Sequence, residues 1–288
     1  MTGNNLLNTI RTAKINWLIF TDLDGTLLDV DTYSFDPAIE SLRYLKNRDI
    51  PVIPCTSKTH IEVLEICKKC GLSGPLIVEN GSAVFFRKEY FKVKTGGVSY
   101  DNEYDVLVLG QTYDLIIKFF GRIKRKFDLS LKGFHEMAPE EIAHYTGLSV
   151  SDSELAKTRL YSEPFVFLKN PGNLDLLQNF VEKNGFRLLR GNRFYHLIGN
   201  TDKGIAVKKL ISLYRLSSGD TTFSTIGIGD SMNDRELLLA TDYAVLVKKK
   251  TGLHQSGIHH KNLLLTNNIG PAGWNEAITK IIKLSPHD

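Results

Sequence analysis

Short apolar segments that each end at a polar loop, with helical patterns between them, constrain the fold of this chain most strongly. The first apolar segment stops at the acidic sequence Thr21-Asp22-Leu23-Asp24-Gly25-Thr26. The three apolar segments are residues 17–20, 50–55 and 76–78. Helical patterns at residues 36–47 and 60–70 lie between them. Strands that alternate with helices through short connections predict a parallel, doubly wound α/β sheet.

The alternation of strands and helices is interrupted between residues 84 and 199. This stretch combines helical patterns, at 113–126 and 174–184, with alternating segments typical of antiparallel strands. The α/β pattern then resumes and continues to the C-terminus. We therefore expect residues 1–83 and 200–288 to form one discontinuous core, and residues 84–199 to form an α+β domain inserted into it.

Composition sets the class of protein. The 288 residues carry 36 Lys and Arg against 32 Asp and Glu, and 42% are hydrophobic, as in globular rather than disordered chains. A net charge of +4 is too small to favour nucleic acid as a partner. No apolar run reaches the ~20 residues that span a bilayer, and residues 1–16 lack the apolar segment of a secretory signal. Three cysteines provide no disulfide framework, which is typical of a reducing compartment. From these four observations together we expect a cytoplasmic protein that binds neither membrane nor nucleic acid.

Two carboxylates end the first predicted strand. Asp22 and Asp24 are two residues apart, which puts them on one face of an extended segment, and Gly25 permits a sharp turn after them. Two neighbouring carboxylates are costly to keep ionised together unless a cation is bound or one of them is protonated. They suit a metal-assisted reaction in which one carboxylate attacks and the other transfers a proton. Taken alone, the loop is explained equally well as an ordinary acidic turn.

Two further segments supply groups that bind anions. Thr56, Ser57 and Lys58 follow the second predicted strand at the start of a helix, where hydroxyls and backbone N–H groups can hold a phosphate. Lys203 begins another predicted helix and could neutralise both a phosphate and the carboxylates. Each has a simpler alternative, a helix cap for the first segment and a solvated lysine for the second.

The last polar loop, 227–234, contributes Asp230 and Asp234. Their spacing of four residues across a strand-to-helix turn lets both carboxylates face one point. Oxygen ligands without a nearby His or Cys cluster favour Mg²⁺ over zinc. Ligands of open α/β sheets bind at the carboxyl ends of the strands, where we expect all four loops to meet. Together they predict an enzyme that transfers a phosphoryl group through an aspartyl-phosphate.

The four loops resemble the four motifs of the haloacid dehalogenase superfamily. The resemblance implies that Asp22 is the nucleophile, that Asp24 acts as general acid and then as general base, and that Thr56 and Lys203 hold the phosphate. The implied Mg²⁺ ligands are Asp22, the backbone carbonyl of Asp24, Asp230 and the adjacent Asp234. The insertion lies between the second and third motifs, which is where the Cof-like branch carries a type IIB cap.

Segments outside these motifs are similar to the mannosyl-3-phosphoglycerate phosphatase family. They are residues 79–81, 161–165, 191–197 and 270–275. The resemblance implies hydrolysis of mannosyl-3-phosphoglycerate, a small sugar derivative with two anionic groups, a phosphate and a glycerate carboxylate. The candidate substrate contacts are Ser57, Lys58, Asn80, Glu163, Arg190 and Arg193, with Arg159 and His196 as further candidates for the carboxylate.

Departures from that family leave alternatives for the substrate and the reaction. Asn192, Met232 and Ala272 stand where the family often has glycine, proline and glutamate. Glucosyl-3-phosphoglycerate or another sugar phosphate could fit a similar pocket. A phosphohexomutase, which returns the phosphoryl group to a second sugar hydroxyl, is a further alternative, as is a non-catalytic sugar-phosphate sensor. The complete set of motif carboxylates and lysine argues against the sensor.

Overall fold

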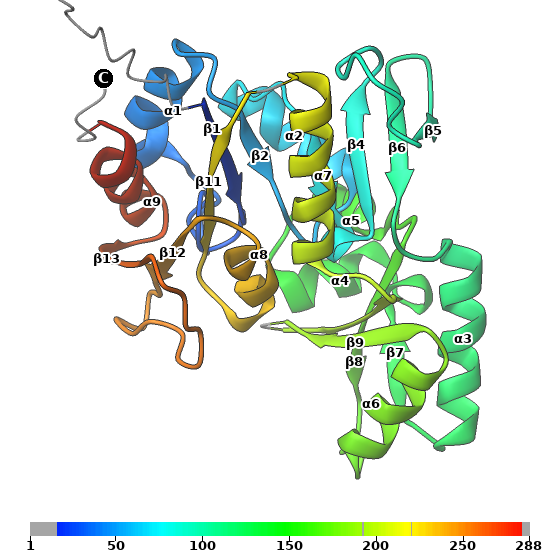
Figure 1. Ribbon diagram of the computed structural model, residues 1–288. Coiled ribbons are helices and arrows are strands. Elements are labelled where there is room, and N and C mark those ends of the chain that lie inside the picture. The colour runs from blue at the N-terminus through cyan, green and yellow to red at the C-terminus, as the bar shows by residue number, and fades with distance from the viewer. Residues whose placement is uncertain (1–15, 192, 220, 284–288) are drawn as a thin grey trace, which may run out of the picture.

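A five-stranded parallel sheet forms the centre of the computed structural model, which describes residues 16–191, 193–219 and 221–283 (Figure 1). The strands, in sheet order, are β13 (Leu263–Ile269), β12 (Tyr243–Lys248), β11 (Phe223–Gly229), β1 (Asn16–Thr21) and β2 (Val52–Pro54). β1 pairs with β11, so segments from opposite ends of the chain lie side by side. The expected parallel α/β sheet is confirmed. Residues 1–15 and Asn192, considered above for their sequence, lie outside the described residues.

Helices cover both faces of this sheet, as a doubly wound fold requires. Alternation along β1 sends Trp17 and Ile19 to one face and Leu18 and Phe20 to the other. The first face packs against α1 (Ile39–Lys46), α2 (His60–Cys70) and α9 (Gly270–Ile278), and the second against α7 (Lys203–Ser217) and α8 (Arg235–Leu239). Short helical turns adjoin these elements, namely η1 (Asp36–Ala38), η2 (Glu79–Gly81), η4 (Met232–Asp234) and η5 (Thr279–Lys283). No helix in the described part of the chain has both the length and the apolar composition needed to cross a membrane.

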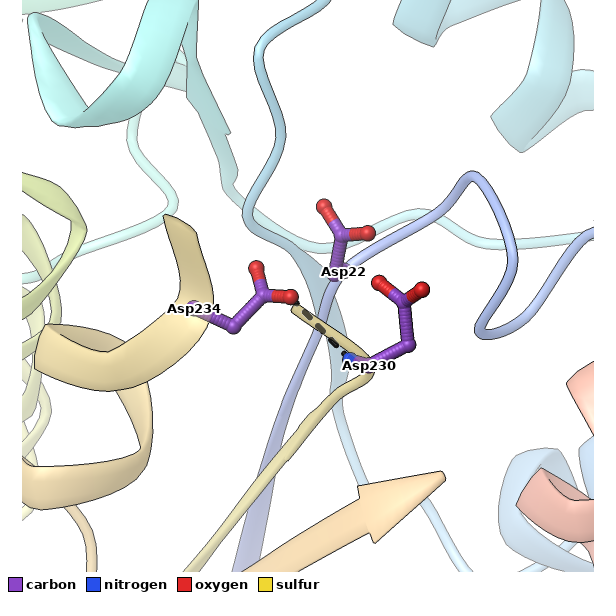
Figure 2. A group of neighbouring side chains, drawn as sticks. All are labelled: Asp22, Asp230 and Asp234. Atoms are coloured by element: carbon purple, nitrogen blue, oxygen red, sulfur yellow. Dashed lines mark hydrogen bonds between the residues drawn. The ribbon is translucent and has the colours of Figure 1, made fainter. Parts of the chain in front are cut away.

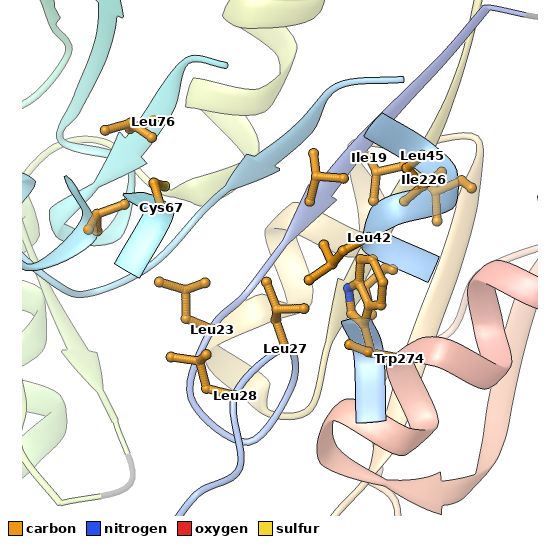
Figure 3. Close-up of a cluster of buried hydrophobic side chains, with 14 of the residues drawn as sticks. Ile19, Leu23, Leu27, Leu28, Leu42, Leu45, Cys67, Leu76, Ile226 and Trp274 are labelled. Carbon is orange, nitrogen blue, oxygen red and sulfur yellow. The ribbon is translucent and has the colours of Figure 1, made fainter. Parts of the chain in front are cut away.

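Apolar packing holds the first polar loop in place (Figure 3). Leu23 and Leu27 of that loop are fully buried in the same cluster as Trp274 of α9. Trp274 Nε1 donates a hydrogen bond to Thr21 Oγ1 (3.1 Å), and this hydroxyl donates to the backbone carbonyl of Asp22 (2.7 Å). The core thereby orients the backbone from which the Asp22 carboxylate projects.

The third apolar segment has the expected direction but belongs to a second sheet. A single parallel bridge between Cys55 and Ile77 joins β3 (Leu76–Val78) to the core sheet, and β3 pairs antiparallel with β4 (Ala83–Arg87), the strand that follows it. The chain reverses within η2, where Asn80 (φ 60°) and Gly81 (φ 87°) adopt left-handed conformations. β5 (Val98–Ser99) and β6 (Tyr104–Val108) complete a second sheet in the order β3-β4-β6-β5.

The rest of the insertion is an antiparallel sheet covered by helices. Its strands, in sheet order, are β7 (Leu131–Gly133), β8 (Ser162–Phe167), β10 (Tyr195–Gly199) and β9 (Phe186–Arg190). One face packs against α3 (Tyr113–Lys126) and α6 (Leu174–Lys183). A separate cluster joins β8 to η3 (Phe134–Glu136), α4 (Pro139–Thr146) and α5 (Val150–Lys157). The expected division at residue 84 remains a prediction, and the pairing of β4 and β6 with β3 favours a boundary after β6.

A buried carboxylate that is not among the predicted site residues joins the core to the insertion. Glu79, in η2, accepts hydrogen bonds from the backbone N–H groups of Leu160 and Tyr161 (both 3.0 Å) and from the hydroxyl of Ser162 (2.7 Å). Burial raises the pKa of Glu79, while these donors and a neighbouring guanidinium favour its charged form. The segment that leads into β8 is thus attached to the turn that follows β3.

Replacing Glu79 with alanine is expected to weaken this junction. Three buried donors would lose their acceptor, and each buried group left unpaired costs about 1–3 kcal/mol. Calorimetric unfolding should give a lower midpoint for Glu79→Ala than for Glu154→Ala, which removes an exposed glutamate from α5. Equal midpoints for the two variants would contradict a joining role for Glu79.

Candidate active site

Parallel strands bring three of the four predicted loops to one edge of the core sheet. Asp22 follows β1, Thr56 follows β2, and Asp230 follows β11. The backbone N–H of Asp22 donates to the carbonyl of Ile228 (2.9 Å), which joins the first and last loops directly. The strand register therefore assembles the site from segments that are far apart in the sequence.

Three buried carboxylates, those of Asp22, Asp230 and Asp234, gather at this edge (Figure 2). One oxygen from each lies within 4.8 Å of the others. Asp234 Oδ2 accepts hydrogen bonds from the backbone N–H groups of Asp230 and Ser231 (both 3.1 Å), which orients the loop after β11. Burial, reinforced by the charge of Asp234, raises the pKa of Asp22 well above its usual value and that of Asp230 to about 7.

The predicted lysine lies among these carboxylates. Lys203 begins α7, and its Nζ is 2.7 Å from Asp22 Oδ1 and 2.7 Å from Asp234 Oδ1. Burial by itself would lower the pKa of Lys203, but the two carboxylates outweigh burial and raise it. Lys203 is therefore a fixed buried cation, and the reading as a solvated surface lysine does not hold.

The donor set fits a divalent cation. Three carboxylates beside one ammonium leave excess negative charge in a buried space, and a cation would neutralise it. Within the described residues, the group contains only oxygen donors, which suit Mg²⁺. The side chain of Asp24 is not one of the three, and its expected contribution to the metal is through its backbone carbonyl.

The Asp24 carboxylate faces the pocket beside Lys58. Asp24 Oδ2 lies 3.1 Å from Lys58 Nζ, and Glu62 Oε1 lies 3.8 Å from the same ammonium. Burial opposes the charge of Lys58, but the two carboxylates raise its pKa. Asp24 Oδ1 has no hydrogen-bond partner in the part of the chain that is described. One carboxylate oxygen of Asp24 is thus free to bind a ligand or carry a proton.

A pocket of about 170 Å³ separates this edge from the insertion. The predicted site residues on its wall are Asp22, Asp24, Ser57, Lys58, Arg193 and Asp230. The core wall carries the carboxylates, whereas the insertion contributes the guanidinium groups of Arg159 and Arg193 and the imidazole of His196. This division of charge suits a small molecule with anionic groups at both ends.

Two predicted residues, Thr56 and Asn80, lie behind the pocket wall. Thr56 is buried, and its Oγ1 accepts a hydrogen bond from the backbone N–H of Lys58 (3.2 Å). Asn80 is also buried, and its Oδ1 accepts from Nδ2 of Asn233, which does line the pocket (3.0 Å). The backbone N–H of Asn80 donates to the carbonyl of Thr56 (2.9 Å), so the two residues brace each other.

Glu163, expected to contact the substrate, does not line the pocket. Side chains alternate along β8, and Glu163 points to the same face as Phe165, toward α3. There Tyr113 donates to Glu163 Oε2 (2.6 Å), and His135 Nδ1 lies 2.7 Å from Oε1. The fully buried carboxylate is bound within the insertion, so this pocket does not support the expected substrate contact, which stays a prediction.

Arg190 lies on that same face of the inserted sheet and is likewise absent from the pocket wall. It is paired in register with Tyr195, and paired residues project to the same side of a sheet. Its exposed guanidinium lies 6.0 Å from the centre of the Tyr195 ring. The expected substrate contact at Arg190 is likewise not supported by this pocket and stays a prediction.

Three aromatic side chains that are not among the predicted site residues line the pocket. The Tyr33 ring lies 5.1 Å from Lys58 Nζ. Phe134 and Phe194 meet edge to face, with ring centres 4.9 Å apart. They come from a core loop, from η3 and from the turn before β10, and only Phe194 lies in a segment, 191–197, that the sequence had singled out. They give an otherwise charged pocket an apolar surface.

Comparisons with known proteins agree with this geometry. Residues 19–255 match the haloacid dehalogenase-like hydrolase family. Relatives from Persephonella marina and Methanococcoides burtonii are 40% and 36% identical, over 92% of this chain and 97% of theirs. Both are glucosyl-3-phosphoglycerate/mannosyl-3-phosphoglycerate phosphatases. A subclass IIB sugar phosphatase of the superfamily has the same fold, with a TM-score of 0.59 and 14% identity over 91% of this chain and 98% of its own.

The family resemblance and the fold expected from the sequence are therefore both confirmed. An α/β core carries an inserted α+β cap of the type IIB kind, and relatives that match nearly the whole chain are phosphatases. This chain belongs to the haloacid dehalogenase-like hydrolases, and within them it is a phosphoric monoester hydrolase.

Proposed function

We propose that this enzyme is a Mg²⁺-dependent phosphatase that converts mannosyl-3-phosphoglycerate to mannosylglycerate and phosphate, with glucosyl-3-phosphoglycerate as the alternative substrate. One observation carries the proposal: the pocket has a lysine-bound aspartate at its core wall and guanidinium groups on the opposite wall. A substrate with a phosphate at one end and a carboxylate nearby matches that arrangement. The names of the two relatives, which include both sugars, support the same substrate class.

In the first step, an oxygen of Asp22 attacks the phosphorus atom. Lys203 holds Asp22 Oδ1, which leaves Oδ2 for the attack. The P–O bond to the glycerate breaks as the bond from Asp22 to phosphorus forms, and Asp24 donates its proton to the departing glycerate oxygen. The product of this step is an aspartyl-phosphate, with Asp24 left as a carboxylate.

In the second step, Asp24 takes a proton from water, whose oxygen attacks the same phosphorus atom. The bond between phosphorus and Asp22 breaks, phosphate leaves, and Asp22 returns to its carboxylate form. The half-exposed side chain of Asp24 can meet both a leaving group and water, whereas Asp22 is largely enclosed. This difference supports the assignment of nucleophile and proton carrier.

Asp22, the carbonyl of Asp24, and Asp230 would hold Mg²⁺, with Asp234 behind them. Bound Mg²⁺ supplies positive charge that lets the carboxylates and the phosphate come together. Lys203 contributes fixed positive charge, and Thr56 shapes the loop that carries the pocket residues Ser57 and Lys58. On the insertion, Arg193 is the exposed cation proposed to meet the glycerate carboxylate.

Replacing Asp22 with asparagine should abolish turnover, because an amide cannot form the aspartyl-phosphate. We expect kcat to fall by about 10³-fold or more, equivalent to about 4 kcal/mol in activation free energy. The control is Asp49→Asn, an exposed site where the backbone φ of 54° also accommodates asparagine. The measurement is the rate of phosphate release by both folded variants. Activity near that of the wild type in Asp22→Asn would show that Asp22 is not the nucleophile.

Mg²⁺ should stabilise the folded protein through the acidic cluster. We expect the unfolding midpoint of the wild type to rise with added Mg²⁺, because only the folded state brings the three carboxylates together. The rise should be much smaller in Asp230→Asn, and in Asp49→Asn it should be as large as in the wild type. Scanning calorimetry at constant ionic strength measures it, and an equal rise in all three proteins would place the binding elsewhere.

The substrate class is tested by a panel ranked by kcat/KM. It contains mannosyl- and glucosyl-3-phosphoglycerate, 3-phosphoglycerate, and hexose 1- and 6-phosphates. We expect the two glycosyl phosphoglycerates to rank first and to release free phosphate. Preference for a hexose phosphate would contradict the proposed substrate, and interconversion of the hexose phosphates without phosphate release would indicate a mutase.

A further inference from the structure

We propose that His196 is a neutral hydroxyl-binding residue for the sugar ring, and thus a specificity-determining residue rather than a partner of the carboxylate. The inference rests on the proposed function and adds to it the group that recognises the glycosyl part of the substrate. Its basis is the position of His196 on β10, the lack of a partner for its ring, and the cations beside it.

Strand geometry directs His196 into the pocket. Its neighbours Tyr195 and Leu197 pack with α3 and α6 on one face of the inserted sheet. Alternation therefore sends His196 to the opposite face, where it lines the pocket with Pro164, its partner in register on β8. This is the same alternation that keeps Glu163 and Arg190 out of the pocket.

The imidazole of His196 has unused hydrogen-bonding capacity. The residue is only 8% exposed, and its Nδ1 is buried without a hydrogen-bond partner among the residues that the structure describes. Buried polar atoms in native proteins are nearly always hydrogen-bonded, so an unpaired one beside a pocket points to a group that arrives with the ligand. Gly191 keeps the ring accessible, since a Cβ there would lie 3.3 Å from His196 Nε2.

Charge decides which ligand group His196 can bind. Burial, with the nearby cations of Arg159 and Lys203, lowers the pKa of His196 to about 3, so the ring is neutral at physiological pH. A neutral imidazole has one N–H donor and one lone pair, and a hydroxyl offers the matching acceptor and donor. A carboxylate is better matched by the exposed guanidinium of Arg193, also on the pocket wall. His196 therefore suits a sugar hydroxyl.

The test compares His196→Phe, which keeps a ring but removes both nitrogens, with His196→Asn, which keeps a polar atom near the Nδ1 position. For mannosyl-3-phosphoglycerate, we expect His196→Phe to raise KM by about 10- to 100-fold with little change in kcat, and His196→Asn to restore part of the loss. Activity on acetyl phosphate, which has no sugar, should stay within about twofold of the wild type in both. Tyr195→Phe, on the opposite face, should behave as wild type.

Deoxy-sugar substrates sharpen the test. The wild type should bind one monodeoxy analogue more weakly than the full substrate. His196→Phe should bind that analogue and the full substrate about equally, because the missing hydroxyl and the missing imidazole are partners. If His196→Phe loses activity on acetyl phosphate to the same extent, this inference alone is overturned. The same holds if the wild type hydrolyses glycosyl phosphoglycerates and His196→Phe does so with an unchanged KM. A wild type that prefers a phosphoester without a sugar would overturn the proposed function as well.

Discussion

The buried ammonium of Lys203 between Asp22 and Asp234 is the interaction on which the site depends. It joins the end of β1, the start of α7 and the loop after β11, and so links the two halves of a core interrupted by a long insertion. Removing one partner of a buried ion pair leaves an uncompensated charge, which is strongly destabilising. The same three groups therefore maintain the fold at this edge and belong to the cluster that we propose binds a phosphate and a metal ion.

Close packing around this contact leaves little freedom. A Cβ on Gly204, the residue after the lysine, would lie 2.4 Å from the backbone carbonyl of Glu236. A Cβ on Gly229 would lie 2.4 Å from the Cβ atom of Asp234. The absence of side chains at these two positions lets α7 and the last loop approach the cluster closely enough for the lysine to reach both carboxylates.

The insertion completes the site from the other side, and it is attached to the core by polar contacts. Arg159 donates through Nη1 to the carbonyl of Ser57 (2.6 Å), and Thr59 Oγ1 donates to the carbonyl of Leu155 (3.1 Å). Together with the contacts of Glu79, they hold the segment of the insertion that precedes β8 against the loop that follows β2. Cationic and aromatic side chains are thereby fixed opposite the carboxylates, at the distance of one small molecule.

The sequence alone determined the parallel core and the acidic edge, because both depend on local patterns. Apolar runs predict strands, and parallel strands must bring Asp22, Thr56 and Asp230 to the same edge whatever their spacing along the chain. The antiparallel strand after β3 could not be predicted in this way, since the left-handed turn at Asn80 and Gly81 reverses the chain into β4, which an apolar run does not reveal.

Tertiary structure alone decided which residues of the insertion face the pocket. All of the first four residues of β8 are buried, on both faces of the sheet, so their composition does not distinguish inside from outside. Pairing with β10 and the position of α3 turn Glu163 away from the pocket and His196 toward it. A shift of one residue in a strand exchanges its two faces, and only packing against the helices selects between them.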